Sequence, residues 1–400
     1  KKDRWNLMAK YFFSSSFLLF LGNWIGQIGL NWFVLTTYHN AVYLGLVNFC
    51  RLVPILLLSV WAGSIADKYD KGNLLRITIS SSFIVTAVLC VLTFTIDSIP
   101  IAVILIYASL RGILSAVETP VRQAVLPDLS DKISTTQAVS FHSFIINICR
   151  SIGPAIAGVI LAAYHAPSTF LAQAICYLVA VLFSLPLHFE VVSNQLENKE
   201  FSLKIVMNYF KRNLEGSKIF ITSLLIMATG FSYTTVLPVL TNHIFPGKSE
   251  VFGIAMTFCA IGGIVATIIL PTILNHLSAV KMYYLSSLLF GLALLGVVIH
   301  NLVIMFICIT LIGLFSQWAR TTNRVYFQHS VKDYERGKVL SIIMMDRGMI
   351  PLGSLVMSFF ADVFGILTTF MIMGITTVAI SVIFYLIQRM TKLEESNNEA

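Results

Sequence analysis

Five arginines stand in long apolar stretches of this 400-residue chain, where charged side chains are otherwise rare. A guanidinium group keeps its charge at any physiological pH, and its planar fork of N–H donors fits a carboxylate or a phosphate. At the centre of a membrane helix an arginine costs about 2.5 to 3.5 kcal/mol, so such a group must face water or a partner inside the protein. The five are Arg51, Arg111, Arg150, Arg320 and Arg347.

Two acidic residues at similar depth, Glu118 and Asp346, cannot neutralise five cations. The surplus positive charge favours an anionic ligand, although each arginine taken alone is also compatible with a structural ion pair or a carbonyl cap. Amide side chains recur at four-residue steps in the first apolar stretch, which places them on one face of a helix. The residues expected to bind substrate are Arg51, Arg150, Arg320, Arg347, Asn23, Gln27, Asn31 and Gln317.

Three titratable side chains within the apolar stretches are candidates for carrying a proton: Glu118, Asp346 and His142. Glu118 lies seven residues after Arg111, on the same helical stripe, so we expect Arg111 to influence its protonation. Two alternatives remain open, because Asp346 adjoins Arg347 and could be its structural partner, and a lone histidine is more often a packing residue.

The elements that position these residues are predicted from the apolar pattern. Hydrophobic residues make up 57% of the chain and charged residues 12%, which excludes a soluble globular protein. The apolar runs are near the roughly 20 residues that cross a bilayer as a helix, and they lack the alternation of membrane strands. We therefore expect an all-α integral membrane protein with twelve transmembrane helices. Their predicted spans are 11–38, 42–66, 74–96, 99–121, 134–163, 168–187, 217–245, 250–275, 281–299, 302–323, 339–363 and 366–388.

The basic residues predict the orientation of these spans. With twelve spans, both termini share one side with alternate loops, and that side holds 21 of the 27 Lys and Arg residues, whereas the opposite side holds only Lys248. Because cytoplasmic loops retain basic residues, both termini are expected in the cytoplasm. The net charge of +8 then faces the inner leaflet and gives no argument for a nucleic-acid partner.

An internal repeat divides the chain into halves. Arg150 precedes Pro154 by four residues, and Arg347 precedes Pro351 by the same interval, 197 residues later. Parallel repeats of this kind build transporters whose two pseudo-symmetric six-helix bundles rock about a central site. The predicted domains are an N-terminal bundle, a cytoplasmic linker, a C-terminal bundle and a disordered polar tail, at 1–188, 189–216, 217–391 and 392–400. The linker contains the sequence FSLKIVMNYFKR, which predicts either a short helix on the membrane surface or a flexible tether.

Two stretches carry a family resemblance. The segment from Gly63 to Arg76 resembles the loop between the second and third helices of the major facilitator superfamily, with Asp70 where glycine is usual. The segment GPAIAG, from Gly153 to Gly158, is similar to the fifth-helix signature of that superfamily's exporters, and Arg111 matches its fourth-helix arginine. The resemblance implies that these stretches form a gate. The implied gating residues are Gly63, Asp67, Lys68, Lys71, Arg122, Gly153, Pro154 and Gly158.

Within that gate we expect Asp67 to pair with Arg122 when the cytoplasmic side is closed. A basic loop that only fixes topology would explain Lys68, Lys71 and Arg76 but not Asp67. The small residues of GPAIAG would let the fifth helix pack closely on a neighbour, and a simple kink at Pro154 is equally consistent with the sequence. In either case we expect a mechanical role for this segment and not a role in ligand binding.

The same stretches resemble the proton-driven branch that includes macrolide and siderophore exporters, and most of all staphylococcal exporters of citrate-derived siderophores. This implies a monomer in the bacterial cell membrane that exports an anionic small molecule, such as a polycarboxylate siderophore, by proton antiport and alternating access. The alternative is a macrolide or multidrug exporter. No hydrolase, metal-binding or phosphate-binding motif is found in the sequence, so we expect neither an enzyme nor a cofactor or metal.

Overall fold

Helices form nearly all of the structure that is described. The computed structural model describes residues 2–129, 135–189, 203–332, 339, 342–343, 346 and 348–398, with the side chains of 59–68 and 392–398, among others, outside that description. Within these residues ten helices are long and apolar enough to cross a membrane, and two shorter apolar stretches, Ala41–Ile55 and Met349–Phe364, accompany them. These elements agree with the twelve predicted spans and the major facilitator architecture.

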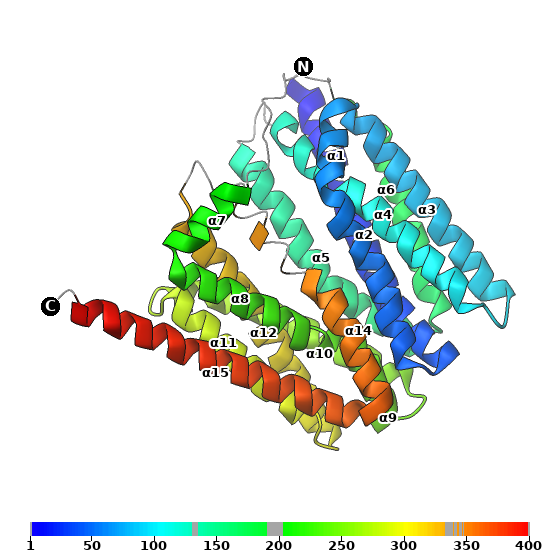
Figure 1. The fold of residues 1–400 in the computed structure, drawn as a ribbon. Coiled ribbons are helices and arrows are strands. Elements are labelled where there is room, and N and C mark those ends of the chain that lie inside the picture. The colour runs from blue at the N-terminus through cyan, green and yellow to red at the C-terminus, as the bar shows by residue number, and fades with distance from the viewer. Residues whose placement is uncertain are drawn as a thin grey trace. The chain divides into compact units, whose positions relative to one another are not determined.

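The elements follow one another without a strand in the described part of the chain (Figure 1). Their bounds are α1 Lys2–Tyr38, α2 Ala41–Lys68, α3 Lys71–Thr95, α4 Ile101–Val125, η1 Leu126–Leu129, α5 Thr135–Ala163, α6 Pro167–Ser184, α7 Leu203–Arg212, α8 Leu214–Thr229, α9 Tyr233–Ile244, α10 Ser249–Leu274, α11 Ala279–Gly296, α12 Leu302–Ser330, α14 Met349–Phe364 and α15 Ile366–Asn398.

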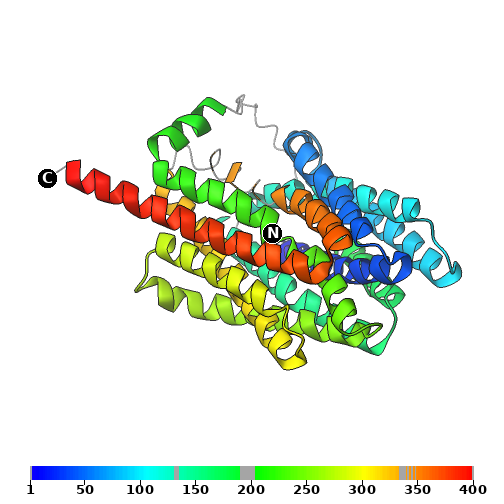
Figure 2. The ribbon, with the colours of Figure 1, turned by 60° about the horizontal axis from the view of Figure 1, so that its bottom comes forward.

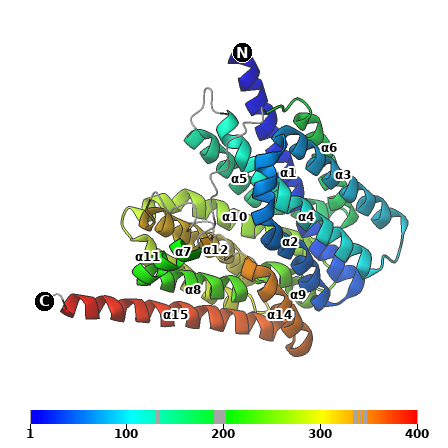
Figure 3. The same cartoon turned by 45° about the horizontal axis from the view of Figure 1, so that its top comes forward.

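The chain forms two compact units. Unit 1 comprises Lys1–Gln195 and Phe245–Thr257, and unit 2 comprises Leu196–Ile244 and Phe258–Ala400. In unit 1, α2 packs on α4, α1 packs on α5 and α6, and α3 packs on α4 and α6 (Figure 3). The closest approach of α2 to α4 is at Gly112, where a Cβ atom would collide with the carbonyl oxygen of Arg51. The helix backbones therefore touch beside two of the predicted functional arginines.

Unit 2 repeats the pattern with α8, α11, α12, α14 and α15. The long α15 packs on α8 and α11, while α11 also packs on α12 (Figure 2). Glycines bring α10 and α12 together, because a Cβ atom on Gly313 would meet the backbone of Cys259. Trp318 of α12 adds a hydrogen bond of 2.9 Å from its indole nitrogen to the carbonyl oxygen of Ala266.

One predicted span is interrupted in the structure. The run 217–245 was expected as a single helix, but α8 ends at Thr229 and α9 begins at Tyr233. The amides of Gly230 and Phe231 both bond to the carbonyl oxygen of Ile226, at 2.8 and 3.1 Å, and the second bond is the five-residue step of a π-type turn. This wider turn interrupts the helix and ends at Phe231.

The polar segments also differ from expectation. The linker sequence forms the helix α7, as one of its two interpretations predicted, and Tyr209 of this helix is buried and hydrogen bonded to Ser330 at 2.8 Å. Asn213 donates to the Tyr209 hydroxyl at 3.0 Å, so α7 is attached to unit 2 and is not a free tether. The prediction of a disordered tail from residue 392 was wrong for the described residues, because α15 continues to Asn398.

Candidate functional site

Arg111 is the centre of a polar network in unit 1. Its guanidinium group donates to the hydroxyl of Tyr177 at 2.7 Å, to Ser82 at 2.5 Å and to the amide oxygen of Asn23 at 3.4 Å. The side chain is buried, and the guanidinium carbon lies 4.9 Å from the centre of the Tyr177 ring. All of these partners are neutral. Arg111 therefore joins α1, α3, α4 and α6 through neutral hydrogen-bond partners, while Glu118 acts on its charge from a distance without a direct bond.

Glu118 takes a different partner from the one expected. One of its carboxylate oxygens accepts from two nitrogens of Arg122, at 3.2 and 3.1 Å. Among the hydrogen bonds of the described residues none joins it to Arg111, which acts on it electrostatically, as the sequence predicted. The Nη1 atom of Arg122 donates to Ser16 of α1 at 2.6 Å, and its Nη2 atom, besides binding Glu118, donates to Ser15 at 3.3 Å. Both charged side chains are buried. The four-residue spacing brings their side chains together directly, whereas the seven-residue spacing to Arg111 spans two turns.

This geometry corrects the predicted latch. Arg122 was expected at the cytoplasmic end of α4 as the partner of Asp67, but it is completely buried and already satisfied by Glu118 and α1. The side chains of Gly63, Asp67 and Lys68 lie outside the described residues. The basic residue of the loop that does form an ion pair is Lys71, whose Nζ lies 2.6 Å from Asp128 and donates to the carbonyl oxygen of Ala124 at 3.0 Å.

Asp70, which departs from the family pattern, has a local role. Its carboxylate accepts from the backbone amide of Gly72 at 2.8 Å and caps the N-terminus of α3. Sequence reasoning missed Asp128, although its place in the short turn after α4, one residue before the turn ends at Leu129, was a recognisable signal for a loop acid.

Three polar residues of unit 1 form a second group, in which Asn31 and Asn48 are buried and Arg51 is half-buried. Arg51 donates to the amide oxygen of Asn48 at 3.4 Å, and Asn48 donates to Asn31 of α1 at 3.0 Å. Gln27 lies one turn before Asn31 and, like Arg150 on α5, is half-buried. Asn48 was not singled out from the sequence, although it precedes Arg51 by three residues and shares its helical face.

His142 lies in a packing environment. Its imidazole ring is buried between Phe12 and Phe20, with ring centres 6.0 and 5.7 Å away. The Nδ1 atom has no hydrogen-bond partner among the described atoms. These neighbours favour the packing interpretation over a role in proton transfer.

The GPAIAG segment makes the close contacts expected of it. A Cβ atom on Gly153 would lie 2.5 Å from Cβ of Trp24 in α1, and one on Gly158 would collide with the backbone oxygen of Gly253 in α10. Pro154 lies inside α5, which continues as a helix through it. At Gly153 and Gly158, a larger side chain would therefore fit only if the neighbouring atoms moved.

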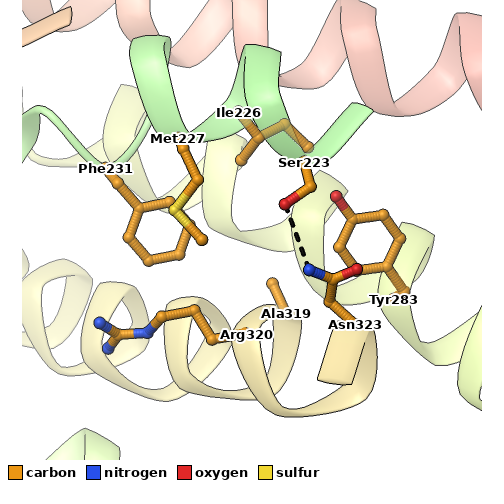
Figure 4. Close-up of a pocket in the computed structure, with 8 residues that line it drawn as sticks. All are labelled: Ser223, Ile226, Met227, Phe231, Tyr283, Ala319, Arg320 and Asn323. Carbon is orange, nitrogen blue, oxygen red and sulfur yellow. Dashed lines mark hydrogen bonds between the residues drawn. The ribbon is translucent and has the colours of Figure 1, made fainter. Parts of the chain in front are cut away.

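The corresponding site in unit 2 is a narrow cavity between α8, α11 and α12 that is too small here to hold a water molecule. Figure 4 shows Arg320 beside Phe231 and, across the cavity, Ser223, Asn323 and Tyr283. The Arg320 guanidinium carbon lies 5.1 Å from the centre of the Phe231 ring, and Nη2 donates to Gln317 at 3.2 Å. Its Nε–H has no partner among the described residues.

Asp346 closes the polar end of this site. Its carboxylate accepts from the hydroxyl of Ser223 at 2.5 Å and from the amide nitrogen of Asn323 at 3.4 Å. The side chains of Asp346, Ser223 and Asn323 are all buried. The side chain expected to pair with Asp346, that of Arg347, lies outside the described residues. Neither Ser223 nor Asn323 was identified from the sequence, because a serine and an asparagine one hundred residues apart carry no spacing signal.

A comparison with known protein families decides what kind of protein this is. The family model described as transmembrane secretion effector, one of the major facilitator families, matches residues 8–400. The chain belongs to this family. It is thus a multi-pass membrane transporter of small molecules and not an enzyme, as the resemblance of the loop and the fifth helix implied.

Individual relatives agree with this assignment. The chain is 78% identical to the staphyloferrin A transporter of Staphylococcus aureus over 98% of this chain and 99% of that one. It is 20% identical to macrolide efflux protein A of Streptococcus pyogenes over 98% of this chain and 99% of the relative. Among solved structures, the nucleoside transporter NupG matches with a TM-score of 0.77 and 14% identity, over 95% of this chain and 98% of NupG. A D-xylose-proton symporter matches with a TM-score of 0.71 and 13% identity, over 94% and 97%. The structural matches establish the fold.

Proposed function

We propose that this transporter exports an anionic polycarboxylate siderophore of the staphyloferrin A type. The observation that carries the proposal is a pair of guanidinium groups bonded to neutral acceptors: the buried Arg111 to a serine, a tyrosine and an asparagine, and the half-buried Arg320 to a glutamine. Such groups retain their positive charge for a ligand, and carboxylates match their geometry. The name of the 78% identical relative supports the same chemistry.

Each unit supplies part of the proposed binding site. In unit 1 the ligand would contact Arg51 and Arg150, with the Asn31–Asn48 pair orienting Arg51. In unit 2 it would contact Arg320, whose free Nε–H is a ready donor, and Gln317. The convergence of these groups on one chamber, together with the contribution of Arg347, is part of the proposal.

Protons are the proposed coupling ion, moved by alternating access of two six-helix bundles in a monomer with both termini in the cytoplasm. Asp346 and Glu118 are the acids available for coupling. We propose that the bundles open and close at the segment 63–76 and at the fifth helix. On that helix Gly153 packs closely against Trp24, and Gly158 packs against the backbone of Gly253.

The test is transport by purified protein in liposomes with an imposed pH gradient and membrane potential. Staphyloferrin A is expected to move, and a macrolide is not, because the charge at Arg111 and Arg320 is positive. Arg320→Ala should reduce staphyloferrin A transport by about tenfold or more, since it removes a charged hydrogen bond. The control is Lys248→Ala, which removes a solvent-exposed cation. Movement of the macrolide but not staphyloferrin A would contradict the proposal and favour macrolide efflux.

A further inference from the structure

Polar contacts join α8 and α15 at the end of unit 2 that carries α7. Lys218, in the second turn of α8, donates from Nζ to the hydroxyl of Thr391 at 2.6 Å. Gln388, one turn before Thr391 on α15, donates to the carboxylate of Glu215 at 2.7 Å. Figure 1 shows α8 beside α15 and α7 joined to the start of α8. These two contacts therefore place the first two turns of α8 beside residues 388–391 of α15.

Basic side chains outnumber acidic ones at this end of unit 2. Lys211 and Arg212 end α7, Arg389 lies on α15, and all three are exposed. Lys218 is half-buried, and the hydroxyl that accepts from it is neutral. Among the described side chains of α7, α8 and α15, Glu215 is the one acid. This end of unit 2 therefore carries an excess of positive charge that attracts an anion.

Exposed apolar side chains adjoin these cations. On α8, Ile221 lies one turn beyond Lys218 and is exposed. On α15, Leu386 lies three residues before Arg389 and Met390 directly follows it, and both are exposed. Because α8 and α15 belong to helices long and apolar enough to cross a membrane, such side chains face lipid tails. Lysine and arginine at this position place their charges at the border between the tails and the headgroups.

The occupant of this surface has to match both its charge and its apolar border. A second copy of the chain would bring the same excess of positive charge and would be repelled. A soluble anion would match the charge and leave the apolar side chains unused. An anionic phospholipid matches both, because its phosphate meets the cations while its tails cover the apolar side chains, and basic pockets between membrane helices bind such headgroups.

We infer that Lys218 and Arg389, together with Lys211, bind the headgroup of an anionic phospholipid such as phosphatidylglycerol. The ammonium group of Lys218 has three N–H donors, so the bond to Thr391 leaves two for a phosphate. The exposed guanidinium group of Arg389 can bind the same phosphate with two parallel hydrogen bonds. A bound headgroup then links α8 to α15. This lipid site is separate from the residues proposed to bind the transported anion and does not depend on what that anion is.

The contact between α7 and unit 2 supports the site from the other side. Tyr209 is buried and hydrogen bonded to Ser330 of α12 at 2.8 Å, so α7 is fixed against unit 2. Met207 and Lys211, one helical turn apart on α7, are both exposed. The outer face of α7 thus repeats the combination of an apolar and a basic side chain that suits a membrane surface.

The experiment measures binding of fluorescently labelled phosphatidylglycerol to the purified full-length protein in a neutral detergent. Wild type is expected to bind it more tightly than labelled phosphatidylethanolamine. Lys218→Ala and Arg389→Ala should each weaken phosphatidylglycerol binding about fivefold, the factor expected for one basic side chain near a membrane surface. Arg389→Lys keeps the charge and should stay within about twofold of wild type. The matched control is Lys10→Ala, which removes an exposed cation of α1 in unit 1 and should leave the affinity unchanged.

Further measurements separate a lipid site from a general attraction of charges. Glycerol 3-phosphate carries the phosphate without the tails, so it should not displace the lipid at equal concentration. Displacement by it would identify a soluble-phosphate site and overturn the inference. Equal affinity of wild type for the two lipids overturns it as well. A loss in Lys10→Ala as large as that in Lys218→Ala would mean that any surface cation suffices, which also overturns it.

Discussion

The two units contain polar clusters of similar arrangement but different net charge. In unit 1, Arg122 of α4 joins a serine of α1 to the carboxylate of Glu118. In unit 2, Asn323 of α12 joins Ser223 of α8 to the carboxylate of Asp346. Because the central residue is Arg122 in unit 1, that cluster contains an ion pair. Because the central residue is Asn323 in unit 2, the carboxylate there is held by neutral donors. The comparison predicts that unit 1 depends on its acid for stability more than unit 2 does.

The largest effect should come from opening the closed pair. Arg122→Ala leaves Glu118 buried without its cation, which should reduce the free energy of unfolding by about 3 to 5 kcal/mol. Asn323→Ala removes only a neutral donor and should cost about 1 to 3 kcal/mol. Unfolding in detergent with increasing SDS measures both. Equal losses in the two variants would remove the distinction between the clusters.

The acids themselves give the next largest contrast. Glu118→Gln leaves Arg122 buried without a counter-charge and should lower the free energy of unfolding by about 3 kcal/mol. Asp346→Asn should change it by no more than about 1 kcal/mol, because no cation depends on this carboxylate through a direct bond. The same unfolding assay applies. A larger loss for Asp346→Asn than for Glu118→Gln would reverse the assignment of roles.

Helix packing extends the comparison to α5 and α14. A Cβ atom on Gly353 of α14 would collide with the carbonyl oxygen of Ala228 in α8, whereas on Gly153 of α5 it would meet the side chain of Trp24. Gly353→Ala should therefore cost about 2 to 3 kcal/mol and Gly153→Ala about 1 kcal/mol, since a side chain yields more easily than a backbone. Gly263→Ala is the control, because its nearest neighbouring atom is 4.0 Å away. Thermal unfolding in detergent ranks the three variants.

The smallest effect should come from the loop. Lys71→Ala removes the ion pair with Asp128, whose side chains are 21% and 27% exposed, and should lower the free energy of unfolding by less than about 1 kcal/mol. Its effect should shrink further in high salt. A loss as large as that of Arg122→Ala would mean that the loop pair, and not the buried one, is the main electrostatic contact of unit 1.

The features of the fold and the site that could be predicted are those that involve residues close together in the sequence. Apolar runs predicted the helices, because burial in lipid requires an uninterrupted apolar stretch. The arginine surplus predicted the charge of the site, but it could not predict that Arg122 would bind Glu118, because spacings of four and seven residues both remain on one face. Contacts such as Ser223–Asp346, 123 residues apart, leave no pattern at all.

The same limit applies to the interruption between α8 and α9. A glycine followed by apolar residues is compatible with a continuous helix and with a π-type turn. The feature that identifies the π-type turn is the hydrogen bond from the amide of Phe231 to the carbonyl oxygen of Ile226, which has no sequence signal. Gly230 lies against the ring of Phe290, and this close approach leaves no room for a Cβ atom there.

The turn at Gly230 and Phe231 gives the arginine of unit 2 an adjustable support. The Phe231 ring beneath Arg320 is carried by backbone that belongs to no regular helix, so small dihedral rotations there would swing the ring while α8 and α12 keep their axes. Tilting the aromatic face away from the guanidinium weakens the cation–π attraction and loosens the side chain. A local backbone joint of this kind would let unit 2 hold its cation rigidly in one state and release it toward incoming solute in another.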